Sequence, residues 1–307
     1  MRLGLCRLMF AVGVAGFVAA GLGLWAMSAS TARAAGTKAQ AKRAKVRVLI
    51  IDGQNNHQWA KTTPAIKKML EETGAFEVTV ATSPSRKADR KAWSKFQPDF
   101  SKCDVVLLNY FGSLWPDDVN VAFERFVSNG GGLVFYHAAV ASFPEWKEFN
   151  EMMGMGWRKA SQGERLTLDA KGREVRTPAG KGPGSGHGPA RAYEVTLRDR
   201  KHPVTADLPA KVMHVKDELY QGMRGPRKNM HVLATGYADE KFRGTGAHEP
   251  LVWTVRYRKG RVFVTLLGHD VPATIAPSSA VFLCRGLQWA ATGAITLPVP
   301  KGLEATK

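Results

Sequence analysis

The sequence has little cysteine, with three residues in 307, at positions 6, 103 and 284. None of them lies directly after the apolar run near the N-terminus, so no cysteine is placed to accept the lipid of a lipoprotein. Cys103 opens an apolar strand pattern and Cys284 falls in an apolar helix pattern. We therefore expect two packed thiols rather than a disulfide, although an oxidising compartment would permit one.

The sequence also lacks an internal repeat, a tightly spaced metal motif such as His-x-x-x-His, and a basic stripe interleaved with aromatic residues. The net charge is nevertheless +18. Because the lysines and arginines are dispersed along the chain, we expect no nucleic-acid partner. A solvated basic surface is the expectation, and an anionic cell-surface polymer is the alternative partner.

The N-terminus has the pattern of an export signal. Arg2 and Arg7 precede an uncharged run over 8–32, and Ala32-Arg33-Ala34 offers small residues at signal-peptidase spacing. The pattern predicts an exported protein, periplasmic or extracellular. The run is also long enough for an uncleaved membrane anchor, which is the alternative and the only case in which we expect a membrane partner.

Strands and helices alternate from residue 46 onward. The β-branched run 46–51 is typical of a strand covered on both faces. A helix follows, with Thr62-Thr63-Pro64 as its cap and first turn and Gly74 as its stop. Further strands are predicted at 76–80, 104–109 and 133–136, with a helix that ends at Asn129 before the last of them. This order predicts parallel strands with helices on both faces.

The second half of the chain has a different pattern. Residues 158–190 are rich in glycine, lysine and arginine, which predicts either a disordered insertion or a mobile loop over the site. Alternating strands follow at 193–197, 230–234, 251–255 and 261–267, and the last two are joined by a hairpin at 258–260. The predicted organisation is a signal peptide over 1–34, a flexible basic lead-in over 35–45, one α/β domain over 46–293 with the insertion at 158–190, and a C-terminal tail over 294–307.

Polar side chains gather where the predicted parallel strands end. Ligands of open parallel sheets bind at the carboxyl ends of the strands. Those ends carry the segments Asp52 to Trp59, Asn109 to Gly112, His137, and Gly268-His269-Asp270. Loops at the opposite edge carry no such cluster, which favours one functional site at the carboxyl edge.

A series of motifs in this order resembles the trehalose-utilisation (ThuA-like) family over residues 46–292. The motifs are Asn56-His57, Gly131 to Ala139 (GGLVFYHAA), His202-Pro-Val, Asp217-Glu-Leu-Tyr220, Pro250-Leu-Val-Trp253, Gly260-Arg-Val-Phe, Leu267-Gly-His269-Asp270 and Leu287-Gln-Trp-Ala290. The resemblance implies a three-layer flavodoxin-like fold of the class I glutamine-amidotransferase-like superfamily, with a mostly parallel sheet and an antiparallel elaboration. It also implies a sugar connection, since relatives act beside oxidoreductases that make 3-keto sugars.

Amidotransferases of that superfamily carry a nucleophilic cysteine at the turn between a strand and a helix. The matching position here is His137, followed by two alanines. We therefore expect no cysteine-dependent glutamine amidotransferase activity. An imidazole can instead accept or donate a proton near neutral pH.

These observations predict a hydrolase or lyase that acts on a keto-disaccharide or glycoside by histidine and carboxylate acid–base chemistry. The candidate catalytic residues are His137, His269, Asp217 and Glu218. The candidate substrate-binding residues are His57, Trp59, Asn109, Tyr110, Tyr220 and Asp270. The expected partner is a small carbohydrate, and no cofactor is predicted.

Two alternatives stay open at this point. A divalent metal is possible, with His57, His137 and His269 as ligands beside a carboxylate from Asp217 or Glu218. The second alternative is a carbohydrate-binding or scaffold protein that kept the fold without catalysis. The remaining histidines rank lower: His202 precedes a proline in a turn, whereas His187 could reach the site if the glycine-rich loop closes.

Overall fold

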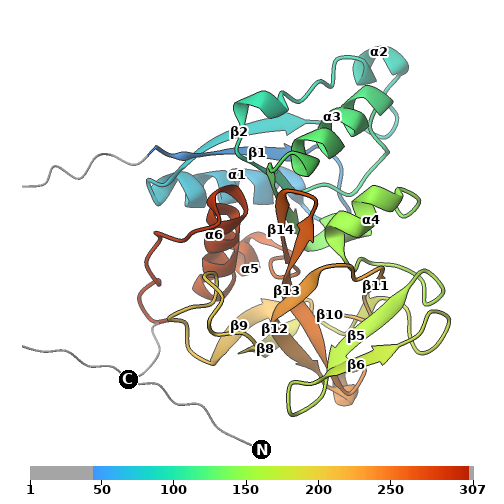
Figure 1. Cartoon of the computed structure of the whole chain (residues 1–307), viewed down its shortest axis with the longest axis vertical. Coiled ribbons are helices and arrows are strands. Elements are labelled where there is room, and N and C mark those ends of the chain that lie inside the picture. The colour runs from blue at the N-terminus through green and yellow to red at the C-terminus, as the bar shows by residue number, and fades with distance from the viewer. Residues whose placement is uncertain (1–43, 304–307) are drawn as a thin grey trace, which may run out of the picture. The chain divides into compact units, whose positions relative to one another are not determined.

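The parallel half of the sheet forms from the β-branched runs. The computed structural model describes residues 44–303. Five parallel strands lie in the order β2, β1, β3, β4, β14 (Figure 1), and their bounds are β1 Val46–Asp52, β2 Phe76–Thr82, β3 Val105–Leu108, β4 Gly132–Tyr136 and β14 Gly260–Thr265. Every residue of β3 and β4 is buried. Both strands are therefore covered on both faces.

Helices cover both faces of these strands. The connection from β1 to β2 through α1 (Trp59–Glu72) runs in one direction along the sheet, and that from β3 to β4 through α3 (Asp117–Ser128) runs in the other. Two right-handed crossovers of opposite direction place their helices on opposite faces. Figure 1 shows α1 with α5 (Val271–Ile275) and α6 (Pro277–Thr292) on one side, and α3 with α4 (Lys147–Met153) on the other. The predicted three-layer flavodoxin-like fold is confirmed.

The antiparallel elaboration extends the same sheet beyond β14. Strand β14 pairs with β13 (Ala247–Tyr257) through the predicted hairpin, and the order continues with β12 (Met230–Ala238), β8 (Arg191–Leu197) and β9 (Lys211–Asp217). Strand β9 was not among the predicted strands, although its burial alternates. Its last residue, Asp217, lies at the same edge of the sheet as the ends of β4 and β14.

The glycine-rich segment is ordered, which corrects the prediction of a disordered insertion or mobile loop. It contains the hairpin of β5 (Glu164–Leu168) and β6 (Glu174–Thr177), and a short strand β7 (Gly186–His187). Strand β5 also pairs with β11 (Arg224–Gly225), and β7 pairs with β10 (Tyr220–Gln221). Strands β5 and β6 thereby join the main sheet, whereas β7 and β10 form a separate two-stranded sheet. The segment is therefore a wall of the domain rather than a loop above it.

One buried arginine holds this segment in place. The Arg224 guanidinium is fully buried and donates to the carbonyl oxygens of Gly163, Pro178, Lys181 and Pro183. Glycine-rich backbone loses much conformational entropy on ordering. The hydrogen bonds from one buried cation to several carbonyl groups offset that loss of entropy, because hydrogen bonds to charged groups are stronger than those between neutral groups.

Helix α1 begins earlier than predicted. The sequence placed its cap at Thr62-Thr63, but the helix starts at Trp59 and Pro64 lies inside it. The carbonyl of Gln58 already accepts the amide of Thr62. The two threonine hydroxyls instead accept the side-chain amide of Asn109, both at 3.0 Å. These hydroxyls therefore tie α1 to the end of β3 rather than capping the helix.

The described chain also contains the short helices α2 (Arg90–Trp93), η1 (Phe100–Lys102) and η3 (Glu240–Phe242). Cys103 and Cys284 are both free and buried, as expected. Among residues 44–303, no helix is long and apolar enough to cross a membrane. The predicted signal peptide, nearly all of the lead-in, and residues 304–307 of the tail lie outside the described residues. Residues 294–303 pack Ile295, Leu297 and Val299 against the core.

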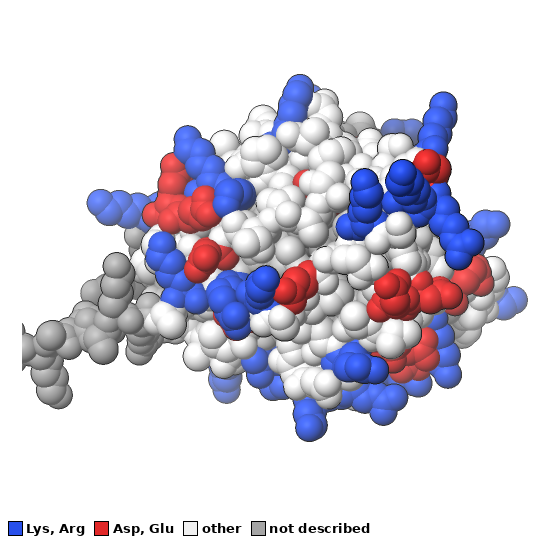
Figure 2. Space-filling view, turned by 90° about the horizontal axis from the view of Figure 1, so that it is seen from above, with Lys and Arg blue, Asp and Glu red and all other residues white. Residues whose placement is uncertain are grey.

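Charged side chains of both signs are mixed on one face of the molecule. Figure 2 shows this face, on which lysines and arginines are interspersed with aspartates and glutamates and form no continuous basic stripe.

Replacing Arg224 with methionine should lower the free energy of unfolding by about 2–4 kcal/mol, because buried carbonyls lose their donor. The segment 178–185 should also become a site of proteolysis. Urea unfolding and limited proteolysis measure the two effects. Arg176→Met is the matched control, since that arginine lies on the exposed strand β6 and its loss should change stability by less than about 0.5 kcal/mol. Equal stability of the two variants would contradict a clamp at Arg224.

Candidate functional site

The candidate site lies where strand β4 turns into the short helix η2 (His137–Ala141). His137 is the first residue after the strand, has a φ of +44°, and is only 2% exposed. A side chain in this left-handed region is strained, and such strain is concentrated at functional sites. The His137 Nδ1 lies 2.7 Å from the carbonyl oxygen of Leu266. Since a carbonyl only accepts, Nδ1 carries the hydrogen and Nε2 points the other way.

Asp217 anchors the edge of the site from the end of β9. Its fully buried carboxylate accepts from the amides of Gly268 and His269, from His269 Nδ1 at 2.6 Å, and from His214 Nε2 at 2.8 Å. Burial alone would raise the pKa of Asp217, but the hydrogen bonds from His214 and His269 outweigh it and hold that pKa well below its usual range. The same carboxylate raises the pKa of His269. Asp217 therefore orients two imidazoles rather than facing a ligand.

The loop that carries His269 needs glycine at position 268. Gly268 has a φ of +107°, and a Cβ built there would lie 2.3 Å from the Tyr136 hydroxyl oxygen. That hydroxyl donates to the Gly268 carbonyl. The end of β4 and the loop after β14 are thus locked together beside Asp217.

Glu218 follows Asp217 but lies among three imidazoles. Its Oε2 is 3.5 Å from His137 Nε2 and 4.0 Å from His57 Nε2, and its Oε1 is 3.8 Å from His187 Nε2. Burial would raise the pKa of Glu218, but the neighbouring His137 outweighs it and lowers that pKa below the usual value. The carboxylate is therefore ionised at neutral pH.

His57 completes the cluster from the loop after β1. Its ring centroid is 4.6 Å from that of His137, and its amide donates to the side chain of Asn55. Burial, reinforced by the neighbouring His137, lowers the pKa of His57 to about 4. The imidazole is thus neutral at pH 7. One donor atom each from His57, His137 and Glu218 lies within 4.8 Å of the others, a spacing at which the three could hold a metal ion.

A cavity of about 220 Å³ opens onto this cluster. Glu218, His57, His187 and Tyr220 line it together with the aromatic side chains of Trp157 and Phe111. The rings of His187 and Tyr220 are stacked with centroids 5.9 Å apart. Polar groups therefore converge on a small space with aromatic walls, an arrangement typical of small-molecule sites.

The chain is similar to proteins of one family over nearly all of the described residues. The sequence pattern of the ThuA family, described as trehalose utilisation, matches residues 47–290. A ThuA-like protein of Parabacteroides merdae has 40% sequence identity and a TM-score of 0.80, over 85% of this chain and 95% of that one. This chain belongs to the ThuA family.

A second ThuA-like protein, from Bacteroides uniformis, has 20% identity and a TM-score of 0.55, over 81% of this chain and 94% of that one, and shares the fold. No curated protein matches the chain. Membership of the ThuA family supports a carbohydrate-related role, in agreement with the resemblance seen in the sequence.

Four of the ten predicted site residues of this ThuA-family chain meet in the cluster, and three more lie beside them. His57, His137, Glu218 and Tyr220 face one another, and Asp217 holds His269, whose ring centroid is 6.2 Å from that of His137. Asp270 caps helix α5 by accepting the amide of Ala273, and its Oδ2 lies 3.6 Å from His269 Nε2.

The remaining three predicted residues are Asn109, Tyr110 and Trp59, and none of them lines the cavity. Asn109 is buried between Asn55 and the two threonines of α1, and Tyr110 is in the core, where its hydroxyl donates to the carbonyl of Ser113. Trp59 is the first residue of α1 and is not among the lining residues. The strand-end rule predicts the edge at which a residue lies, but it does not give the direction of each side chain.

Sequence reasoning missed three contributors to the site. His214 ranked low but is fully buried between Asp217 and Ser278. Trp157 and Phe111 were not proposed as cavity walls. A signal was available for His214, because the alternation in β9 places it on the same side as the buried Val212.

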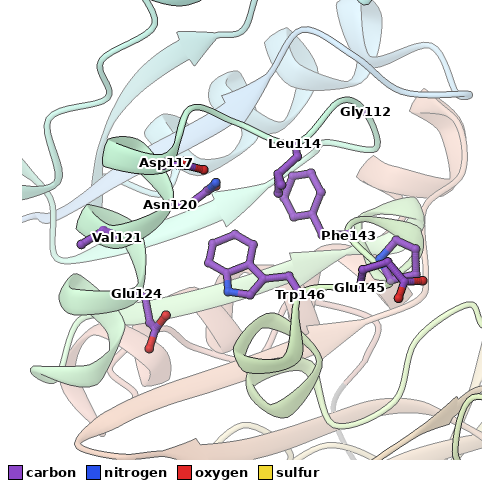
Figure 3. A pocket seen from close by; sticks show the side chains of 10 residues that line it. Gly112, Leu114, Asp117, Asn120, Val121, Glu124, Phe143, Glu145 and Trp146 are labelled. Carbon is purple, nitrogen blue, oxygen red and sulfur yellow. The ribbon is translucent and has the colours of Figure 1, made fainter.

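A larger cavity of about 570 Å³ lies beside α3, outside the cluster. Figure 3 shows the Trp146 indole between Phe143 and the side chains that α3 contributes. Glu124 and Glu145 are among its lining residues, but no histidine is. The cluster at Glu218 is the stronger candidate site despite its smaller cavity, because titratable groups with shifted pKa values converge there.

Replacing Asp217 with asparagine should lower the free energy of unfolding by about 2–4 kcal/mol, since a buried charge that accepts from two imidazoles is lost. Chemical denaturation measures the change. Asp270→Asn is the matched control, because asparagine caps a helix about as well as aspartate and the change should stay within about 0.5 kcal/mol. An Asp217→Asn variant as stable as that control would contradict the anchoring role.

His202 provides a prediction on pH. Burial lowers its pKa to about 4, and its ring packs on Trp289 with centroids 5.0 Å apart. The folded chain therefore binds this proton less readily than the unfolded chain, whose histidine pKa is about 6.5. The contribution to stability is complete above pH 6.5 and is lost as the pH falls toward 4.

Replacing His202 with glutamine should consequently reduce the loss of stability between pH 7 and pH 4 by an amount on the order of 1–3 kcal/mol. Denaturant unfolding of both proteins across that range measures the difference. Parallel stability curves would show that His202 does not titrate in this way.

Proposed function

We propose that this chain acts on a sugar that carries a ketone, and that Glu218 removes a proton from the carbon beside that ketone. The observation that carries the proposal is the setting of Glu218, a carboxylate on the wall of a small cavity among three imidazoles. Family membership supports a sugar as the substrate. The volume of about 220 Å³ favours a small ligand over a polymer.

The reaction we propose is an elimination across the glycosidic bond. Glu218 takes the proton, the electron pair of the broken C–H bond forms a C=C bond, and the C–O bond to the leaving alcohol breaks. The leaving oxygen receives a proton, and the imidazole of His187 on the cavity wall is suited to supply it. Addition of water to the product would complete a net hydrolysis.

Tyr220 supplies a hydrogen bond for the charge that develops on the ketone oxygen. Burial raises the pKa of Tyr220 far above the neutral range, so its hydroxyl remains a donor. The hydroxyl oxygen lies 3.3 Å from His57 Nε2 on the cavity wall. A donor held in a partly dry site stabilises an enolate more than water does.

The variant Glu218→Gln tests the proposed base more directly than a variant of His137, which is buried behind Glu218. Glutamine keeps the size of the side chain but cannot accept a proton. Turnover of a p-nitrophenyl 3-keto-glucoside should fall by about 10²–10⁴-fold, the usual worth of one positioned proton-transfer group. Release of p-nitrophenol measures the rate.

Glu145→Gln is the matched control, because Glu145 lines the larger cavity and should not affect turnover. Thermal midpoints of both variants establish that they are folded. Undiminished turnover by a folded Glu218→Gln protein would overturn the assigned base. A wild-type protein that binds keto-glycosides without turning them over would instead support a carbohydrate-binding role.

A further inference from the structure

Two buried polar atoms of the cluster lack a hydrogen-bond partner. They are His137 Nε2 and Glu218 Oε2, which make no hydrogen bond although they lie 3.5 Å apart, within ion-pair distance of each other. Buried polar atoms in proteins are nearly always paired, so an unpaired one in a native site calls for a ligand, a water or an ion. Two such atoms on opposite sides of one gap indicate a shared partner between them.

The surroundings of His137 prepare its Nε2 to be a ligand. Its Nδ1 hydrogen is donated to the Leu266 carbonyl oxygen at 2.7 Å, which leaves Nε2 as the ring atom that can offer a lone pair to an ion. Imidazoles that bind metals usually donate their other ring hydrogen to a carbonyl or a carboxylate, which fixes the tautomer and the orientation of the ring. The strained backbone of His137, with a φ of +44°, fixes that orientation further.

His57 Nε2 is the third donor atom at the gap. It lies 4.0 Å from Glu218 Oε2, and the three donor atoms are all within 4.8 Å of one another. Bonds of about 2.0–2.2 Å in tetrahedral geometry separate ligand atoms by about 3.3–3.6 Å. The pair of His137 and Glu218 already has that spacing. His57 needs to move inward by about 1 Å, and the Tyr220 hydroxyl, 3.3 Å from His57 Nε2, would have to turn away.

We propose that His57, His137 and Glu218 bind one divalent transition-metal ion through Nε2, Nε2 and Oε2. Two histidines and one glutamate form a ligand set of catalytic zinc sites, which keep a fourth position open. Because Glu218 and His57 line the cavity, that open position faces the cavity. His269 is outside the set, since it is not among the residues whose donor atoms lie within 4.8 Å of one another.

This proposal rests on the proposed function only for the role of the ion, which would draw electron density from the ketone oxygen. The two assignments to Glu218 are compatible because a carboxylate has two oxygens. Its Oε2 faces the two ligand histidines, whereas Oε1 lies on the side of His187. The binding of the ion can therefore be tested without a sugar.

The test uses the full chain purified without a histidine tag and stripped with a chelator. We expect one equivalent of Zn²⁺ or Co²⁺ per chain by calorimetry, and the Co²⁺ protein should show the visible absorption of a four- or five-coordinate site. The variants His57→Gln and Glu218→Gln should each weaken Co²⁺ binding by at least about 10-fold to 100-fold. His231→Gln is the matched control, because His231 pairs with Asp199 on the surface and should leave binding unchanged.

Absence of stoichiometric Zn²⁺ and Co²⁺ binding by the wild type would overturn the metal site, as would unchanged binding by both ligand variants. The two proposals fail in different ways. Keto-glycoside turnover that persists in excess chelator would leave the proposed function in place without a metal. Tight binding of Co²⁺ by a protein that turns over no keto-glycoside would keep the metal site and overturn the proposed function.

Discussion

The candidate site depends on the hydrogen bonds that the buried carboxylate of Asp217 accepts. It stands at the last residue of β9, in the antiparallel part of the sheet, and accepts from the loop after β14, in the parallel part. A buried carboxylate requires several donors to stay charged, and here two imidazoles and backbone amides supply them. The hydrogen bonds therefore fix the two parts of the sheet relative to each other at the edge where the cavity opens.

The same constraint explains why two adjacent carboxylates behave differently. Successive side chains of an extended chain point to opposite sides, so Asp217 and Glu218 cannot share an environment. Asp217 points inward to His214 and His269, whereas Glu218 points to the imidazoles around the cavity. One dipeptide thus provides both the anchor and a carboxylate on the cavity wall, and the position of Glu218 follows directly from the burial of its neighbour.

Local patterns in the sequence were sufficient for the parallel half of the fold and for the edge that carries the site. β-Branched runs specify strands covered on both faces, and polar residues after them locate the carboxyl edge. Long-range pairing was not accessible in the same way. The order of residues 158–190 depends on Arg224, which is distant in the sequence. The direction of Asn109 and Tyr110 depends on α1 and on the core rather than on their place after a strand.

The two halves of the sheet contribute different residues to the candidate site. The parallel half contributes His57 and His137, and the buried His137 does not line the cavity. The antiparallel half and its glycine-rich wall contribute Glu218, Tyr220 and His187, which line the cavity. His57, from the parallel half, lines the cavity with them, so the proposed chemistry draws on both halves of the sheet and depends on the Asp217 hydrogen bonds that hold one half against the other.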